Sequence, residues 1–147
     1  MVEIKNAALL TGLFGHWPDF HDAELIALRL DAAGHAGPSL EADFEVAEMS
    51  EEVDDRGYYR DRQRARATLR FGSVRRLRLN DFLYQNVLGA LALAPAGPED
   101  FDEVFGPDWD QGRRRYRVSW GSSIGCAADF LCDSIAVVVA TPVTQAT

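Results

Sequence analysis

The sequence predicts a mainly β to α+β fold, built as a single antiparallel, strongly twisted sheet or a small sandwich of about seven or eight strands with a short N-terminal helix. Short segments alternate between apolar and polar residues with period two, turn residues such as glycine and proline separate them, and only one short segment suits a helix. The 147 residues, 47% apolar and 26% charged, carry no repeat or linker. We therefore expect one domain over residues 1–147.

The chain begins with the segment that suits a helix. Asn6 is a candidate N-cap for a short helix over Ala7–Phe14, and Gly15 suits the left-handed position after its end. Residues 16–18 offer no small-residue cleavage site, so we expect no secretory signal. Since no stretch is long enough to span a membrane, we expect a cytoplasmic protein with no membrane partner.

The first predicted strand covers Glu24–Leu30, where alternation would place Leu25, Ala27 and Arg29 on one face. Large apolar residues in Asn80–Asn86 indicate a packed loop or a single helical turn. The other short strands come later in the chain. They are predicted at Val74–Leu79, Val87–Ala94, Arg115–Trp120, Cys126–Phe130 and Ile135–Ala140.

Two strands between these carry opposite charge. Glu41–Asp55 holds eight acids and no base, whereas Arg56–Arg78 holds nine arginines and one acid. In both blocks the charged residues alternate with apolar ones, which is typical of half-buried strands. We expect the two strands to pair antiparallel, with acids opposite arginines on the exposed face and a polar connection over Ser50–Asp61.

The charge balance also limits the partners. The net charge is −8, and the acidic strand would screen the arginines of its neighbour. Phosphate backbones are repelled by such a surface, so we expect no nucleic-acid partner.

One cluster of titratable residues precedes the first strand. His21, Asp22 and Glu24, with His16, raise the alternative of a metal- or histidine-dependent hydrolase. Pro18 lies between the two histidines, however, so no regular helix presents both. We expect no metal, no cofactor and no catalytic residue here, and instead a turn in which His21 or Asp22 caps the strand through backbone hydrogen bonds.

Two further patterns could suggest a nucleophile. Cys126 and Cys132 lie too far apart along an extended chain for a disulfide, and we expect both to be reduced core residues. Ser123 has glycines two residues away on each side, as in a nucleophile elbow. The elbow needs a following helix, but a strand is predicted there, so we expect a hairpin turn.

Several short motifs together resemble one family, the immunity protein 50 family of bacterial polymorphic toxin systems. The resemblance extends over most of residues 16–140. It lies in Trp17-Pro18-x-Phe20-His21-Asp22-Ala23-Glu24, Leu28-x-Leu30-Asp31, Ala67-Thr68-Leu69-Arg70-Phe71, Asp81-Phe82, Gln85-Asn86-Val87 and Ser122-Ser123-x-Gly125. It implies a non-enzymatic protein that neutralises a cognate toxin by binding it. Trp17, His21, Asp22 and Glu24 form a motif of unknown role.

The candidate partner-binding segment is Glu99–Asp110, where three aromatic residues are interleaved with six acids. Such a surface would steer a basic toxin toward it. An equally weighted alternative is that the aromatics fold back as a lid on the sheet. The candidate contact residues are Phe101, Asp102, Glu103, Phe105, Asp108, Trp109 and Asp110.

A second function class stays open beside the immunity protein. It is a structural or oligomerising β-rich domain with no catalytic role, and homo-oligomerisation is not decided by the sequence. The gene immediately upstream would discriminate between the two classes, because immunity genes lie directly downstream of toxin genes.

Overall fold

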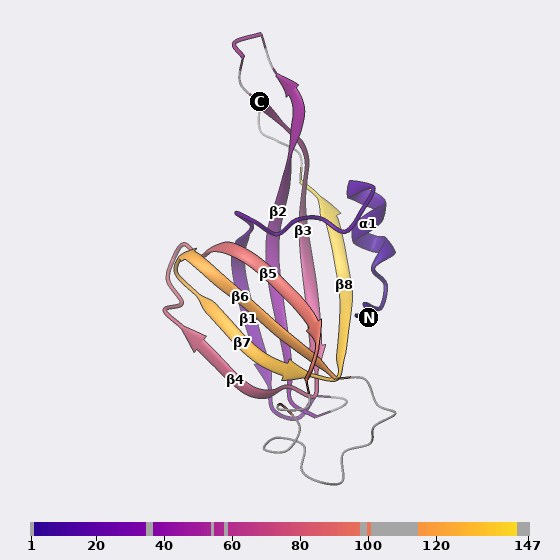
Figure 1. Ribbon diagram of the computed structural model, residues 1–147, viewed down its shortest axis with the longest axis vertical. Helices are drawn as coiled ribbons and strands as arrows, with labels where there is room; N and C mark the ends of the chain where they lie inside the picture. Colours follow the sequence, from indigo (N-terminus) through magenta and orange to yellow (C-terminus); the bar gives the residue numbers. More distant parts are fainter. Residues whose placement is uncertain are drawn as a thin grey trace.

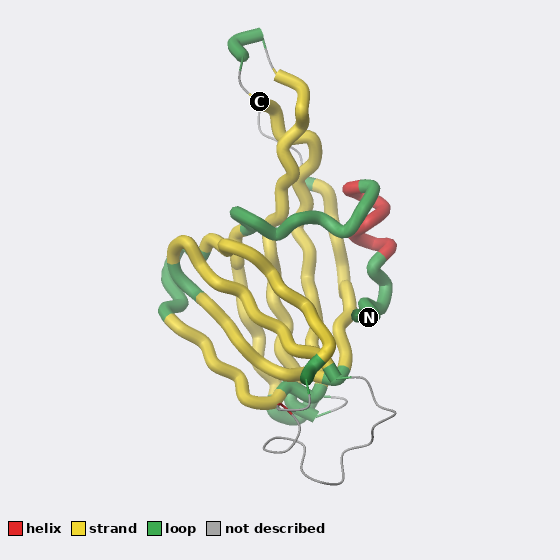
Figure 2. Tube along the Cα trace, in the orientation of Figure 1, coloured by secondary structure: helices red, strands yellow, loops and turns green. Residues whose placement is uncertain are grey.

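The computed structural model describes residues 2–34, 37–53, 55–57, 59–97, 100 and 115–143. These residues form one short helix, α1 (Ala8–Phe14), and eight strands in one antiparallel sheet (Figures 1 and 2). The strands are β1 (Glu24–Asp31), β2 (Ser39–Val53), β3 (Tyr59–Gly72), β4 (Arg75–Asn80), β5 (Val87–Pro95), β6 (Tyr116–Ile124), β7 (Ala127–Cys132) and β8 (Ser134–Pro142). The predicted mainly β fold with a short N-terminal helix is confirmed.

The sheet bends so that its two halves face each other. The strand order is β4-β7-β6-β5-β1-β2-β3-β8, and Figure 1 shows the first four strands in front of the last four. The halves are joined at β1 and β5, which share a single paired position, Glu24 opposite Val87. Long ladders hold each half together, so this short junction is where the sheet turns from one layer into the other.

A second bend lies where β3 leads into β4 and β7 leads into β8. The Asp133 N–H donates to the carbonyl of Gly72 over 2.9 Å, and Gly72 lies opposite Ser134 in the β3–β8 ladder. A Cβ at position 72 would collide with the Ser134 Oγ. A larger residue at position 72 would therefore require the Ser134 hydroxyl to rotate away where the two strands turn into the other layer.

The core follows from the alternation in β2 and β3. Their inward residues are fully buried and oppose one another with a large side chain against a smaller one in most pairs. The pairs are Leu40–Phe71, Ala42–Leu69, Phe44–Ala67 and Val46–Ala65. This complementary volume lets the second layer pack closely on the first.

A continuous chain of aromatic rings links the two layers. Phe44 of β2 meets Trp120 of β6 edge-on, with ring centroids 5.5 Å apart, and Trp120 meets Phe130 of β7 at 6.0 Å. Edge-to-face contacts of this kind add about 0.5–1.5 kcal/mol beyond the burial of area. In order through the core the rings are Trp17, Phe20, Phe44, Trp120, Phe130 and Phe71.

The N-terminal segment covers the β8 side of the core. Lys5 bridges Ala136 of β8, and α1 buries Leu10 and Phe14 in the same cluster. Gly15 ends the helix at φ +83°, as predicted. The predicted N-cap is wrong: Asn6 has φ +58°, and the structural cap position makes no side-chain hydrogen bond. The turn before α1 is built from backbone instead, with the Leu9 N–H donating to the Asn6 carbonyl.

The prediction that Leu25, Ala27 and Arg29 share one face of the first strand is wrong, because Leu25 lies on the opposite face from the other two. A bulge between Leu25 and Ala27 shifts the register of β1 against β2. Leu25 therefore points into the core, whereas Ala27 and Arg29 lie opposite the outward residues of β2.

Two predicted connections also differ from the structure. Residues 50–53 and 59–61, expected in a polar connection, continue β2 and β3 as a longer hairpin (Figure 1, top). The loop expected to be packed, residues 81–86, instead exposes most of its large apolar side chains. In the part of the chain that the structure describes, no helix has the length and apolar character that a membrane crossing requires.

The aromatic chain predicts a sharp difference between two phenylalanines. Phe44→Ala should lower the free energy of unfolding by about 3–5 kcal/mol, because it leaves a cavity between the layers. Phe82→Ala should lower it by less than about 1 kcal/mol, because half of that side chain is already in solvent. Urea unfolding of both variants checks this, and equal losses would contradict the central position of Phe44.

Candidate interaction surfaces

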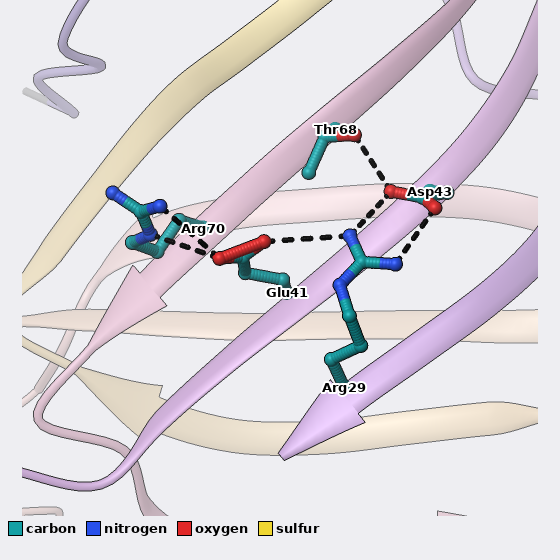
Figure 3. A network of polar contacts seen from close by, with 5 residues as sticks. All are labelled: Arg29, Glu41, Asp43, Thr68 and Arg70. Atoms are coloured by element: carbon teal, nitrogen blue, oxygen red, sulfur yellow. Dashed lines mark hydrogen bonds and ion pairs between the residues drawn. The ribbon is translucent and has the colours of Figure 1, made fainter. Parts of the chain in front are cut away.

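The outer face of β1, β2 and β3 carries a network of ion pairs (Figure 3). Arg29 donates from both terminal nitrogens to Asp43, over 2.8 and 2.7 Å, and reaches Glu41 at 3.3 Å. Arg70 donates to the other side of Glu41 over 3.2 and 3.1 Å. The Thr68 hydroxyl donates to Asp43 over 2.6 Å. Each acid is thus held between two strands.

This network confirms the predicted pairing of acidic and basic strands. The β2–β3 ladder places Glu41 opposite Arg70 and Glu45 opposite Arg66. The hydrogen bonds from Arg29 hold the pKa of the Asp43 carboxyl below its usual value, and the same contact raises the pKa of Arg29. Because these acids are neutralised within the sheet, the face fixes strand register and offers little net charge to a partner.

The segment before β1 is held by a carboxylate of the hairpin. Glu48 Oε1 lies 2.6 Å from His16 Nε2 and accepts a longer hydrogen bond, 3.4 Å, from the Asp19 N–H. Asp19 in turn accepts from the His21 N–H over 2.9 Å, which closes an Asx turn. The ring of Trp17 packs 5.7 Å from that of Phe20 at the end of the aromatic chain. These contacts give His16 and Trp17 structural partners.

The prediction that His21 or Asp22 caps the first strand with its side chain is therefore wrong. The capping side chain is Asp19, since Asp22 contributes its backbone N–H, which donates to the Leu88 carbonyl over 2.9 Å. Asp22 has φ +65°, and its Oδ2 lies 3.2 Å from His21 Nδ1. Within the described ranges, no group of three or more histidine, cysteine, aspartate and glutamate side chains is placed to hold a metal ion.

A buried asparagine organises the loop between β4 and β5. Asn86 is 2% exposed, and its Oδ1 accepts from the N–H groups of Leu83 and Cys126, each over 2.9 Å. Its Nδ2 donates to the Leu83 carbonyl over 2.7 Å. Gly125 lies against this amide at φ +81°, and a Cβ there would be only 2.6 Å from the Gln85 carbonyl. The loop is thus fixed to the turn between β6 and β7.

The same loop presents an exposed apolar surface. Tyr84 is 99% exposed, Phe82 53% and Leu83 48%, and Ile124 on the neighbouring turn is 49% exposed. Figure 1 shows the β4–β5 connection beside the β6–β7 turn. We call Phe82, Leu83, Tyr84, Val87 and Ile124 the corner patch. This surface was not predicted from the sequence, although three large apolar residues, Phe82, Leu83 and Tyr84, lie between polar pairs and outside any alternation, which could have indicated an exposed loop.

Acidic side chains border the corner patch. Glu24 of β1 lies opposite Val87 of β5, which lies opposite Ile124 of β6, so the three form a row on the outer face. Asp22 precedes this row, and Asp81 opens the loop. No arginine or lysine among the described residues forms an ion pair with Asp22, Glu24 or Asp81.

The corner patch brings together motifs that are distant in the sequence. Residues 21–24, 81–87 and 122–125 meet where β1, β5 and the β6–β7 turn join. The motif of unknown role is divided between two places. Three of its residues lie beside the corner patch, namely His21, Asp22 and Glu24, whereas Trp17 packs onto the core.

A shallow hollow of mixed charge lies between β4, β6 and β7. Arg117 sits between two acids, with its guanidinium 3.4 Å from Asp129 and 3.7 Å from the buried Asp100. Arg76, Arg78, Phe130 and Leu131 also line the hollow. Arg117 is already paired with protein carboxylates, so it offers little uncompensated charge to an anion there.

The nucleophile candidates are also structural. Cys126 and Cys132 are free and buried, and burial raises the pKa of both thiols, that of Cys132 to about 12. Ser123 lies within β6 and is followed by β7, so the strand-to-helix turn of a nucleophile elbow is absent there. The hairpin turn falls at Gly125, slightly later than Ser123.

Of the predicted partner-binding segment Glu99–Asp110, the structure describes only Asp100. Asp100 is buried, accepts a hydrogen bond from the Gly97 N–H over 2.9 Å and lies 3.7 Å from the Arg117 guanidinium. All of the candidate contact residues lie outside the described residues: Phe101, Asp102, Glu103, Phe105, Asp108, Trp109 and Asp110.

Comparison with known proteins gives one match. A family model described as Immunity protein 50 matches residues 6–142. No curated protein and no solved structure shows a significant match to the chain.

The Arg29–Asp43 contact predicts a pH dependence of stability. A carboxyl whose pKa is lowered on folding stabilises the protein above its unfolded pKa, near 3.8, and this contribution is lost as the pH falls through the folded value. Between about pH 5 and pH 2, the Asp43→Asn variant should therefore lose less stability than the parent protein. Urea unfolding across this range checks it. Asp31→Asn is the control, because Asp31 is exposed and accepts one hydrogen bond, from the Ala33 N–H, in place of an arginine contact; it should change the slope less than Asp43→Asn does.

The buried amide of Asn86 predicts a stability loss. Asn86→Ala leaves two N–H groups and one carbonyl without their partner, which should lower the free energy of unfolding by about 1–3 kcal/mol. Gln85→Ala, the exposed neighbour, should change it by less than about 0.5 kcal/mol. Urea unfolding compares them, and an unchanged midpoint for Asn86→Ala would show that the amide does not hold the loop.

Proposed function

Because the chain belongs to the immunity protein 50 family, we propose that it neutralises a cognate toxin by binding it directly, without catalysing a reaction. The observation that carries the proposal is the extent of the family match, residues 6–142, which includes every strand of the sheet. We propose that residues 1–147 act as one domain and that the protein works in the cytoplasm. Proteins of immunity families are generally non-catalytic, and the histidines of the first motif have structural partners.

The charge distribution supports a basic protein partner. The net charge is −8, while the strongest acidic and basic strands neutralise each other across β2 and β3. The acids that remain without ion-pair partners provide long-range attraction for a basic surface and repel phosphate backbones. Within the segment Glu99–Asp110, Asp100 is buried and lies 3.7 Å from the Arg117 guanidinium. We propose that the acids of residues 101–110 contribute to this attraction and that the aromatic residues there contribute contact area.

The proposal predicts a stable complex with the product of the gene immediately upstream. That product alone should arrest the growth of a bacterial host, and co-expression of this chain should restore growth. The purified proteins should form a stoichiometric complex in size-exclusion chromatography, because a lasting block of a toxin requires slow dissociation. Surface plasmon resonance measures the two rates.

Two comparisons make this test specific. A toxin from an unrelated system should neither bind this chain nor be neutralised by it. Asp102→Asn, Glu103→Gln and Asp108→Asn together should slow association at low salt, because they remove steering charge. Restored growth without any complex, or a toxin that leaves the mixture chemically altered, would overturn neutralisation by binding.

A further inference from the structure

Resting on the proposed function, we propose that the corner patch is the anchor by which this chain docks into its toxin. The toxin would present an apolar pocket bordered by lysine and arginine side chains. Phe82, Leu83 and Tyr84 would enter the pocket, and Asp22, Glu24 and Asp81 would meet its basic border.

The first argument is the exposure of large apolar side chains. Tyr84 is 99% exposed, so its ring stabilises nothing in the folded chain. The flanking Phe82 and Leu83 are about half exposed, and Ile124 extends the apolar surface onto the neighbouring turn. Tyrosine and other aromatic anchors contribute most of the affinity in many interfaces, because they bury a large area with few rotatable bonds. The loop is therefore better explained by a partner than by the fold.

The second argument is that the backbone beneath these side chains is fixed. The buried amide of Asn86 forms hydrogen bonds with the Leu83 backbone and with the Cys126 N–H at the neighbouring turn. Gly125 allows the turn to approach this amide in a conformation that other residues rarely adopt. An anchor fixed in this way loses little conformational entropy on binding, which raises the affinity gained from each buried side chain.

The third argument is the charge around the patch. Three acids of β2, Glu41, Asp43 and Glu45, are paired with arginines of β1 and β3. In contrast, Asp22, Glu24 and Asp81 have no arginine or lysine partner in the described part of the chain. An apolar centre whose acidic border has no arginine or lysine partner among the described residues complements an apolar pocket with a basic border.

The same charge argues against a second copy of this chain as the occupant. A two-fold dimer through the corner patch would bring the patch against itself. The acidic border of one copy would then face that of the other, with like charges in contact. A basic protein from a different gene is the partner that this surface fits.

The test measures binding of the purified upstream gene product to full-length variants of this chain. Tyr84→Ala and Phe82→Ala should each weaken binding by about 30-fold or more, mainly through faster dissociation. Leu30→Ala is the matched control, because Leu30 is a similarly exposed apolar residue (57%) at the far end of β1, and it should change affinity less than about threefold. Asp22→Asn, Glu24→Gln and Asp81→Asn combined should slow association at low salt and lose this effect at high salt.

The possible outcomes distinguish a failure of the proposed corner patch from a failure of the proposed function. Urea unfolding should show Tyr84→Ala as stable as the parent protein, so a loss of binding reports contact and not misfolding. If the parent protein binds and neutralises the toxin while Tyr84→Ala and Phe82→Ala bind equally well, the patch is wrong and the function stands. If the parent protein does not bind, both fail. A parent dimer that Tyr84→Ala dissociates, with toxin binding unchanged, would assign the patch to a second copy and overturn the proposal.

Discussion

The structure depends on the alternation of side chains over Leu40–Val46 of β2 and Ala65–Phe71 of β3. One face of this hairpin places large apolar residues opposite smaller ones, such as Phe44 and Ala67, and the other places acids opposite arginines. A slip of one residue would put the whole apolar set in solvent and the whole charged set in the core. The ion pairs are exposed and individually weak, so burial sets the stability while the charges add to the specificity of register.

Everything else is arranged around the inner face of that hairpin. The second layer packs Trp120 and Phe130 onto Phe44 and Phe71, which requires the sheet to bend back on itself. The bend leaves β1 and β5 with only one paired position, so the backbone at this corner needs other partners. Asn86 and the Asp22 N–H supply them, and the corner becomes a rigid place from which side chains can project.

Local alternation made the strands and the charge pairing predictable, because both repeat every two residues. Features that depend on contacts between residues distant in the sequence could not be predicted in this way. The bulge in β1 inserts one residue near Ile26 and reverses the faces, and nothing in the local pattern marks it. Charged residues at 50–61 indicated a connection, yet residues 50–53 and 59–61 extend two paired strands. Phe82 and Tyr84 were expected to pack, since apolar residues in a loop usually do, but Asn86 holds the loop outward by contacts 40 residues apart in the chain.

The net charge of −8 does not by itself show where the uncompensated acids lie on the surface. Three arginines of β3, Arg64, Arg66 and Arg70, lie next to acids of β2, so these side chains offer little uncompensated charge to a phosphate. Carboxylates at the corner, such as Glu24, have no such compensation in the described residues. Their electric field extends into solvent beside an apolar surface. Electrostatic attraction of a partner and burial of apolar area would therefore act at the same place. The proposed basic partner would be attracted by the acids to the place where it can bury the apolar surface.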